Sequence, residues 1–203
     1  MSEPVIAQAR VPEDTPDFIN LMLMTAPEFF PALYGSRFDR VFSELFRRTR
    51  NHLSYQHVDV VRVDGATAGM VLGYDWAAYK KEGRRAGMVT CRYMGRRLFS
   101  HGKHLQWTAD VLVKIEAGIH YISNMAVYPQ FRRHGLATAM LRRSEDIARK
   151  AGNTRMALDV ETCHEPAMCL YRDFGMKVVG GPKRTTIDGH KFEFVRMEKD
   201  IWR

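Results

Sequence analysis

Hydrophobic and polar positions change their spacing along the chain, and each change marks an expected element. Residues 5–10 are typical of a first strand. Thr15 followed by Pro16 predicts the start of a helix that runs to about residue 24, because Thr caps helix N-termini and Pro fits the first helical position. A second helix is expected over about residues 38–50.

The clearest local signal in the first half is a hairpin. Residues 57–63 and 67–74 have the pattern of two strands, and Asp64-Gly65 separates them. An Asp-Gly pair supplies the positive φ angles that a tight hairpin turn requires. The sequence therefore predicts two antiparallel strands here.

Residues 77–117 carry two conflicting patterns. Helical propensity is high over about residues 85–99, whereas apolar residues alternate from Trp107 to Ile115 as they would in a strand. Leu112 interrupts that alternation, so we favour a second helix there. The whole segment is expected to form a helical insertion.

From residue 119 onward the pattern is more regular. Residues 119–127 are rich in β-forming side chains and are ended by Pro129, which has no N–H for a strand ladder. From Gly135 apolar residues fall three or four apart, as on one face of a helix, and Gly152 ends that helix as a C-terminal cap. The remaining elements follow in order: a short strand over residues 156–160, a helix from Pro166 to Gly175, a strand near Val178, a turn at Asp188-Gly189 and a last strand over residues 192–197.

This order of elements predicts the architecture. Strand–helix–strand units with a hairpin at each end indicate an α/β protein whose mixed sheet has helices on both faces. No repeat or linker divides the chain, so residues 1–203 are expected to form one domain with a helical insertion at about residues 77–117.

The composition limits the compartment. The chain is 45% hydrophobic and 27% charged, which is typical of a folded domain and not of a disordered segment. Its three cysteines are not at zinc-binding spacing, so we expect free thiols in a reducing compartment. The first residues do not resemble a secretory signal, and no stretch reaches the roughly 18 apolar residues that span a bilayer. We therefore expect a cytoplasmic protein without a membrane partner.

The segment 127–141 joins a strand to the N-terminus of an amphipathic helix. Such a junction binds anions, because the first helical N–H groups lack partners within the helix and the macrodipole places about half a positive charge there. Gly135 and Ala137 leave the backbone accessible to phosphate oxygens, and Arg132 and Arg133 add positive charge. The segment therefore predicts a phosphate-binding turn.

Two motifs in the second half resemble those of the GCN5-related N-acetyltransferase (GNAT) superfamily. The run Arg132-Arg133-His134-Gly135-Leu136-Ala137 resembles its R/Q-x-x-G-x-G/A signature. The second motif, similar to the family's fifth strand and following helix, consists of Leu158-Asp159-Val160, Ala167, Leu170-Tyr171 and Phe174-Gly175-Met176. Together they cover about residues 119–176, while the first half fits the family's topology without carrying a motif.

The resemblance implies a GNAT fold, in which a mixed, mostly antiparallel sheet of about six or seven strands is splayed between its fourth and fifth strands. Acetyl-CoA would lie in the gap, with pantetheine paired to the strand backbone and the pyrophosphate accepting N–H bonds from the turn. The cofactor-binding residues implied in this way are Met125, Ala126, Val127, Arg132, Arg133, His134, Gly135, Leu136, Ala137, Thr138, His164 and Tyr171.

Two residues depart from the family pattern. His164 stands where the family usually has an Asn that bonds the pantetheine amide, and an imidazole cannot reproduce both functions of an amide. Met176 replaces the last Phe of the motif and is expected only to pack.

Acyl transfer from a thioester to an amine needs a neutral amine, a donor for the oxyanion and an acid for the leaving thiolate. The resemblance implies that the backbone N–H near Met125 is the oxyanion donor. Tyr171 matches the position of the general acid in many members, and a phenol with a reference pKa near 10 keeps its proton at neutral pH. Packing against the cofactor is its alternative role.

Asp159 is the expected general base, because some N-terminal acetyltransferases of the family carry a proton-accepting carboxylate there. Its alternative role is to fix the sheet. Glu161 shares its face, and Glu116 and His120 are further candidates that would act through water. A base is unnecessary if the amine arrives deprotonated.

Other polar groups have plainer interpretations. His101 and His104 lie three apart, but no carboxylate or third ligand is near them in sequence, so no metal is expected. Cys163 is expected to pack as a buried free cysteine and not to act as a nucleophile.

The favoured function is an acetyl-CoA-dependent N-acetyltransferase that works by direct attack in a ternary complex. Its acceptor is either a small amine or a peptide or protein amine. The net charge of +8 favours anionic partners. The basic residues from Lys80 to His104 lie on the insertion expected to cover the acceptor site, and they would suit an acidic acceptor or a phosphorylated or ribosomal partner. A solvated surface is the plainer interpretation of those bases.

Two other functions stay open. One is an acyl-CoA sensor without turnover. The other is a basic nucleic-acid-binding module. Two features argue against it: the chain has no recognisable nucleic-acid-binding motif, and its aromatic residues are not interleaved with its basic residues. Nucleic acid is therefore not expected as a partner, and the oligomeric state stays open, a homodimer included.

Overall fold

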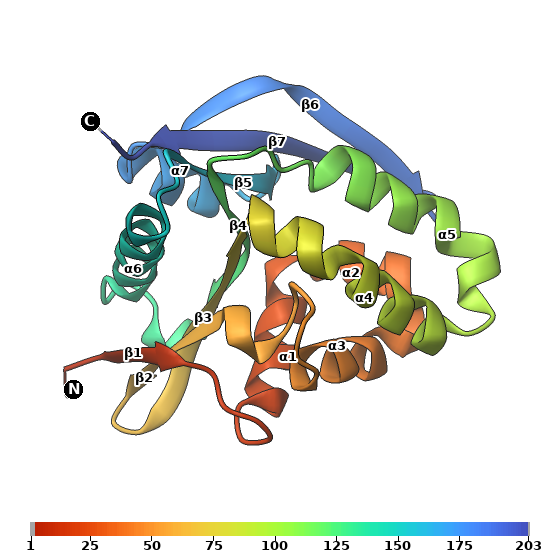
Figure 1. Cartoon of the computed structure of the whole chain (residues 1–203), viewed down its shortest axis with the longest axis horizontal. Helices are drawn as coiled ribbons and strands as arrows, with labels where there is room; N and C mark the ends of the chain where they lie inside the picture. Colours follow the sequence, from red (N-terminus) through yellow and green to blue (C-terminus); the bar gives the residue numbers. More distant parts are fainter. Residues whose placement is uncertain (1–2, 203) are drawn as a thin grey trace.

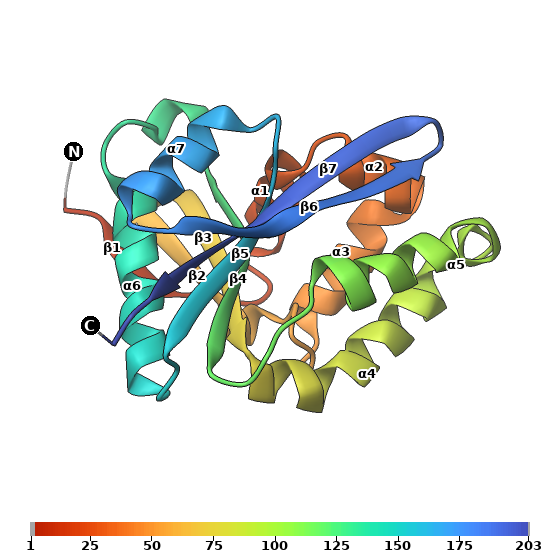
Figure 2. The same ribbon diagram turned by 90° about the horizontal axis from the view of Figure 1, so that it is seen from above.

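The computed structural model describes residues 3–202 and shows one twisted sheet between two layers of helices (Figures 1 and 2). Over these residues the sheet has seven strands in the order β1-β2-β3-β4-β5-β7-β6. The strands are β1 (Val5–Gln8), β2 (Val58–Val63), β3 (Ala66–Asp75), β4 (Ile119–Val127), β5 (Arg155–Glu161), β6 (Lys177–Ile187) and β7 (His190–Asp200). All neighbours are antiparallel except β4 and β5, so the expected mixed, mostly antiparallel sheet is confirmed.

The helices lie on both faces of the sheet, as the sequence predicted. They are α1 (Thr15–Thr25), α2 (Phe29–Tyr34), α3 (Phe38–Arg47), α4 (Trp76–Met94), α5 (Arg97–Trp107), α6 (Leu136–Lys150) and α7 (Glu165–Asp173). Short helical turns are added at Gly35–Arg37, Tyr55–His57, Thr108–Leu112 and Pro129–Phe131. Figure 2 shows α6 and α7 on one side of the sheet and α1 to α5 on the other.

The start of α1 differs from the sequence expectation. Thr15 already belongs to the helix, and the preceding Asp14 holds the capping position without a side-chain bond to the helix. The Asp14 carboxylate instead accepts hydrogen bonds from the Arg10 backbone at 2.6 Å and from the Arg62 guanidinium at 2.6 Å. The expected capping role of Thr15 was therefore wrong, because an ion pair to β2 holds this end of the helix.

The region between β3 and β4 also differs in detail. The helix expected over residues 85–99 is two helices, because Gly95 has a φ of 58° and ends α4 before α5 begins. The second helix expected near Leu112 is a short π-helical turn, Thr108–Leu112.

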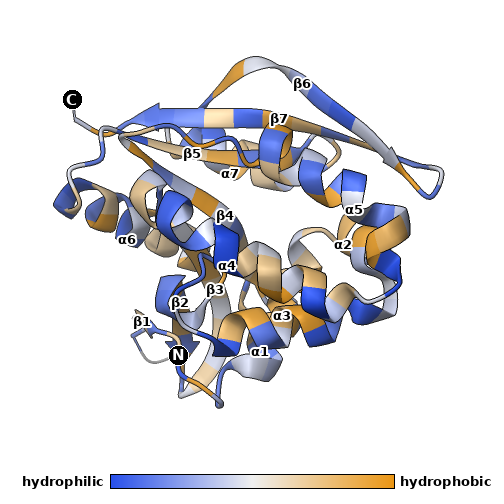
Figure 3. Ribbon diagram, turned by 45° about the vertical axis from the view of Figure 1, so that its right-hand side comes forward, coloured by the Kyte–Doolittle hydropathy of each residue, from blue (hydrophilic) through white to orange (hydrophobic). Residues whose placement is uncertain are grey.

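Helix α2 was missed by the sequence analysis. It is six residues long and contains Pro31, so hydrophobic periodicity has too few turns to mark it. Tertiary packing stabilises it, since the Phe29 ring meets the rings of Phe192 and Phe194 edge-on, each at a centroid distance of 5.2 Å. Figure 3 shows stretches of apolar colouring on both α2 and α3.

The sheet opens between its two parallel strands. Strands β4 and β5 pair only where Ile119 to Tyr121 face Arg155 to Ala157. Beyond that point β4 stays with β3 as far as Val127, and β5 stays with β7 as far as Glu161. The expected splay between the fourth and fifth strands is confirmed, and it opens a gap at the carboxyl ends of both strands.

Among residues 3–202, none of the helices is both long enough and apolar enough to cross a bilayer.

Candidate active site

The turn before α6 has an unusual backbone. Arg133 and Gly135 have φ angles of 67° and 76°, on either side of His134, and α6 begins at the next residue, Leu136. A non-glycine residue with a positive φ is uncommon, and such strain collects at functional sites. Alternation of this kind turns successive N–H groups toward one point, which forms an anion-binding nest.

Hydrogen bonding in this turn leaves its donors free. In the described part of the chain, Arg132 N and Ala139 N have backbone acceptors, while no acceptor is recorded for the N–H groups of residues 133–138. The N-terminal end of the helix dipole lies at the same place. The turn can therefore surround an anion with backbone donors.

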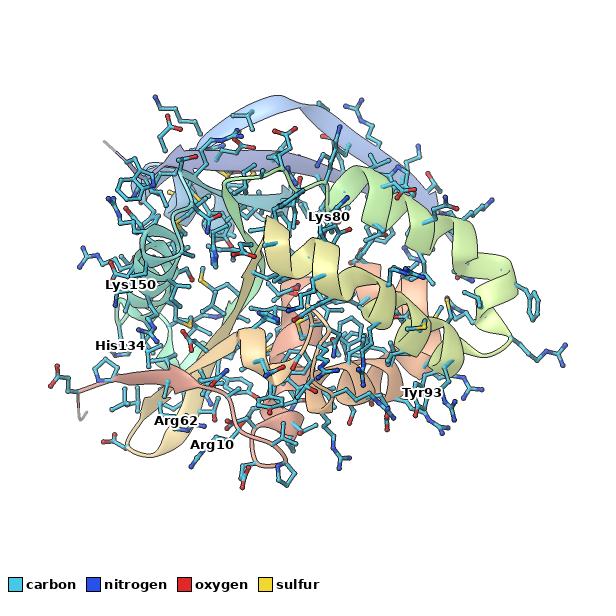
Figure 4. All side chains as sticks on the ribbon, in the orientation of Figure 1. Arg10, Arg62, Lys80, Tyr93, His134 and Lys150 are labelled. Carbon is cyan, nitrogen blue, oxygen red and sulfur yellow. The ribbon has the colours of Figure 1, made fainter. Side chains whose placement is uncertain are left out.

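The side chains of the turn fix its position. The Arg132 guanidinium donates to the Val127 carbonyl at 3.1 Å, which links the turn to the end of β4. Leu136 is buried in the core and anchors the turn from below. Arg133 and His134 are exposed, and Figure 4 shows His134 at the end of α6 close to β1.

Beside the turn, β4 offers an unpaired edge. Met125, Ala126 and Val127 pair with β3 on one side, whereas on the other side β5 has already separated. The register of β4 shifts at Ser123, a bulge of the kind found next to active sites. Backbone groups that face the gap can pair with an extended ligand as an added strand would.

A cavity of about 920 Å³ lies against this gap. Its wall at the gap comes from the carboxyl ends of β4 and β5 and from α7, and the residues there are Ser123, Asn124, Met125, Asp159, Glu161, His164 and Tyr171. Helices α1 to α5 contribute to the rest of the wall, together with residues of β3, β7 and the loop before β2. The sequence-predicted residues Met125, Asp159, His164 and Tyr171 are thus brought to one cavity, while the anion-binding turn lies beyond the end of β4.

Tyr171 lies on the inner face of α7 with only 8% of its surface exposed. Burial raises the pKa of its phenol to about 12, so the hydroxyl keeps its proton at neutral pH. Its place on the wall of the cavity fits a group that donates a proton.

Asp159 is held between two cations. Its carboxylate accepts from Lys183 Nζ and from Arg196 Nη2, each at 2.7 Å, and also from the Tyr121 hydroxyl at 3.1 Å. Only 2% of its side chain is exposed. The Asp159 carboxylate therefore holds β5 to β6 and β7.

Glu161 has a different environment on the same strand. Burial raises the pKa of its carboxyl, and among residues 3–202 no ion pair joins it to an Arg or Lys. The two further candidates lie elsewhere: Glu116 is exposed and pairs with Arg155, and buried His120 lines a separate cavity of about 190 Å³. Glu161 is therefore the carboxylate of the main cavity that is best suited to take a proton.

Glu161 also belongs to a possible metal-binding group. Its carboxylate, the Cys163 thiol and the His164 imidazole have ligand atoms within 4.8 Å of one another. This set of oxygen, sulfur and nitrogen donors is one that zinc accepts. Cys163 was expected to be buried but is exposed, because it lies in the turn between the end of β5 and α7.

Most of the basic residues of α4 and α5 lie away from the cavity. Arg97 donates to the Leu33 carbonyl at 3.1 Å and pairs with Asp188, so it has a structural role. Asp188 also bonds His101 Nε2 at 3.1 Å, a carboxylate contact that sequence proximity did not indicate. Of the bases from Lys80 to His104, Lys80 and Arg84 line the cavity.

Comparison with known proteins identifies the family of this chain. The model of the acetyltransferase (GNAT) family matches residues 22–176. The chain is 30% identical over 59 residues to a putative ribosomal protein bS18-alanine N-acetyltransferase of Bacillus subtilis, a match that spans 29% of this chain and 39% of that protein.

Solved structures match over nearly the full length. An N-acetyltransferase from Staphylococcus aureus Mu50 has a TM-score of 0.62 and 20% identity, covering 96% of this chain and 100% of that one. A putative acetyltransferase from Salmonella typhimurium, solved with its cofactor acetyl-CoA, has a TM-score of 0.60 and 18% identity, covering 100% and 96%. These likenesses show a shared fold.

Proposed function

Because the chain belongs to the acetyltransferase (GNAT) family, whose model matches residues 22–176, we propose that it transfers the acetyl group of acetyl-CoA to a primary amine. The observation that carries this proposal is the separation of β4 from β5 after Tyr121. It leaves the edge of β4 unpaired, and in our proposal this edge is the path that connects the turn, with its free N–H groups, to the cavity. A long molecule with an anionic end and a reactive end fits such a path.

In this proposal the cofactor follows the path from one end to the other. The pyrophosphate accepts hydrogen bonds from the N–H groups of residues 133–138, with positive charge from Arg132 and Arg133. Leu136 packs beneath and Ala137 and Thr138 begin the helix. Pantetheine lies along Met125, Ala126 and Val127, and His164 on the opposite wall provides one polar contact.

The reaction then takes place at the inner end of the gap. The amine nitrogen attacks the thioester carbonyl carbon, and the backbone N–H near Met125 stabilises the oxyanion. When the carbon–sulfur bond breaks, Tyr171 donates its proton to the thiolate of CoA. The attacking nitrogen also loses a proton during the reaction. A side chain of the protein must accept this proton unless water does so.

We assign that base to Glu161 in preference to Asp159. Asp159 is engaged by Lys183 and Arg196, and its removal would leave two cations without a partner. Glu161 has a pKa raised by burial and lines the same cavity. A carboxylate with a raised pKa is a stronger base at neutral pH.

Two measurements test the proposal with the full chain. Calorimetry should show binding of acetyl-CoA and CoA, and a thiol-release assay over a panel of amines should show acceptor-dependent release of CoA. Binding without release from any amine would indicate an acyl-CoA sensor, and absence of binding would overturn the proposal.

A further inference from the structure

The cavity extends well beyond the place where the acetyl group would lie. Its far part runs between α4 and α5, and we call it the α4–α5 cleft, lined by Gly83, Gly87, Leu98, Gly102 and Leu105. Pockets for drug-sized ligands measure about 300 to 1,000 Å³, and this cavity measures about 920 Å³. An acetyl group occupies a small part of such a volume, so the cleft has room for a second molecule.

Apolar side chains form the floor of the α4–α5 cleft. Phe29, Phe30 and Tyr34 of α2 line it together with Phe42 of α3. Phe29 and Phe42 are buried in the core, which holds the floor rigid. A surface of this kind stabilises an apolar body that is removed from water.

Helix α4 presents small residues to the cleft. Gly83, Ala86, Gly87 and Thr90 recur at helical spacing and all line it. A Cβ atom added at Gly83 or Gly87 would meet nothing within 4 Å. Glycine inside a helix is less stabilising than alanine, so the two glycines keep space open at a cost to the helix.

A buried polar atom at the cleft lacks a partner. His52 lines the cavity between Tyr74 and Tyr79, with ring centroids at 4.9 and 5.1 Å. Within residues 3–202, its Nδ1 is buried and has no hydrogen-bond partner. Burial lowers the pKa of the imidazole to about 4, so the ring is neutral and can exchange one hydrogen bond with a bound molecule.

The cleft reaches the surface on α4. Gly87 and Cys91 line it and are exposed, and we take this side, away from the gap that the cofactor would fill, as the entrance for the acceptor. Lys80 and Arg84 are exposed on the same helix, and Figure 4 labels Lys80 there. An acyl chain attached to CoA would not need this entrance, whereas an acceptor would.

We infer that the acceptor is a primary amine carried on an apolar, aliphatic or aromatic body that lies in the α4–α5 cleft; this inference rests on the proposed N-acetyltransferase function. The amine points to the gap between β4 and β5, where Glu161 and Tyr171 lie. The apolar body lies between the glycines of α4 and the aromatic floor, and His52 bonds a polar group of the acceptor.

The test uses the full chain and a series of straight-chain amines from ethylamine to hexylamine. These amines have nearly equal basicity, so differences among them report on the apolar chain. Since each buried methylene contributes about 0.8 kcal/mol, kcat/KM should rise about fourfold per added carbon until the cleft is filled. A flat series would overturn the inference.

Filling variants locate the chain. Gly87→Leu and Gly83→Leu should lower kcat/KM for hexylamine at least about tenfold, because the added side chain occupies the cleft, and should leave ethylamine within about twofold. The matched control is Ala77→Leu, which adds a leucine to an exposed position of α4 outside the cleft and should change neither amine. Equal losses for both amines in the glycine variants would overturn the inference.

A second arm separates the acceptor from the acyl chain. With ethylamine as acceptor, acetyl-, butyryl- and hexanoyl-CoA are compared, and acetyl-CoA should remain the best donor. A rise in kcat/KM with acyl length, without a rise with amine length, would place the acyl chain in the cleft and overturn the inference. Acetylation of a peptide or a polyamine, with no rise of kcat/KM along the alkylamine series, would overturn this inference and leave the proposed function intact. If no amine led to CoA release, both the inference and the proposed function would be overturned.

Discussion

Asp159 of β5 and Arg196 of β7 are direct partners in the sheet register, and their side chains form an ion pair with an N–O distance of 2.7 Å. Lys183 of β6 approaches the other carboxylate oxygen at 2.7 Å. One carboxylate therefore joins three strands next to the gap, and this arrangement separates the structural carboxylate, Asp159, from the one proposed as the base, Glu161.

We expect Asp159→Asn to lower the free energy of unfolding by about 3 to 5 kcal/mol, because removal of one partner leaves buried charges uncompensated. Urea unfolding of the variant measures the loss. Activity measured well below the unfolding transition should be retained. A stable variant without activity would instead indicate that Asp159 is the base.

Glu161→Gln should affect activity and not stability, the opposite of Asp159→Asn. Its stability should change little, while kcat/KM should fall about 100-fold, the usual range for loss of a general base. Because burial disfavours the charged carboxylate and raises its pKa, the base becomes active only at a higher pH than an exposed Glu would require. The wild-type pH profile should therefore have an acidic limb above the usual range of a Glu carboxyl, and the variant should lose it. An unchanged acidic limb would exclude Glu161.

Tyr171→Phe tests the proton donor. The phenol pKa of about 12 keeps it protonated, so the variant loses the proton for the thiolate. We expect kcat to fall about 100-fold with an unchanged KM for acetyl-CoA. Unfolding should shift by less than about 1 kcal/mol, since the ring that packs is retained. An unchanged kcat would show that Tyr171 only packs.

Gly135→Ala tests the anion-binding turn, and the same helix has a matched control. Gly135 before α6 and Gly152 after it both have a φ of 76° and no atom within 4 Å of an added Cβ. Alanine at either position should therefore cost about 1 to 2 kcal/mol of stability from the left-handed backbone. Only Gly135→Ala should weaken acetyl-CoA binding, by about tenfold in calorimetry, because its methyl group meets the phosphate oxygens. Equal affinities in the two variants would exclude the turn as the pyrophosphate site.

Local features of the chain determined much of the fold. Strand β4 was predicted with the bounds it has, because its β-forming residues end at Pro129. Both hairpin turns were predicted from Asp-Gly pairs, and Asp64, Gly65, Asp188 and Gly189 all have the positive φ angles that such turns require. Each of these features depends on neighbours within a few residues.

The glycine turn before α6 and the inner face of α7 were predictable for the same reason. A glycine at the start of a helix and residues spaced three or four apart determine backbone angles and helix faces directly. Gly135 and Tyr171 are therefore where the sequence indicated.

The pairing of distant side chains depended on tertiary structure alone. Asp159 meets Lys183 and Arg196 because β7 inserts between β5 and β6 in the sheet, and no periodic pattern records which carboxylate faces which cation. The α4–α5 cleft is of the same kind. The small residues of α4 could be seen in the sequence, but only the packing of α4 against α3 and α5 decides that they face open space. Local sequence sets φ, ψ and the buried face of each element, whereas contacts between elements depend on how all of them pack together.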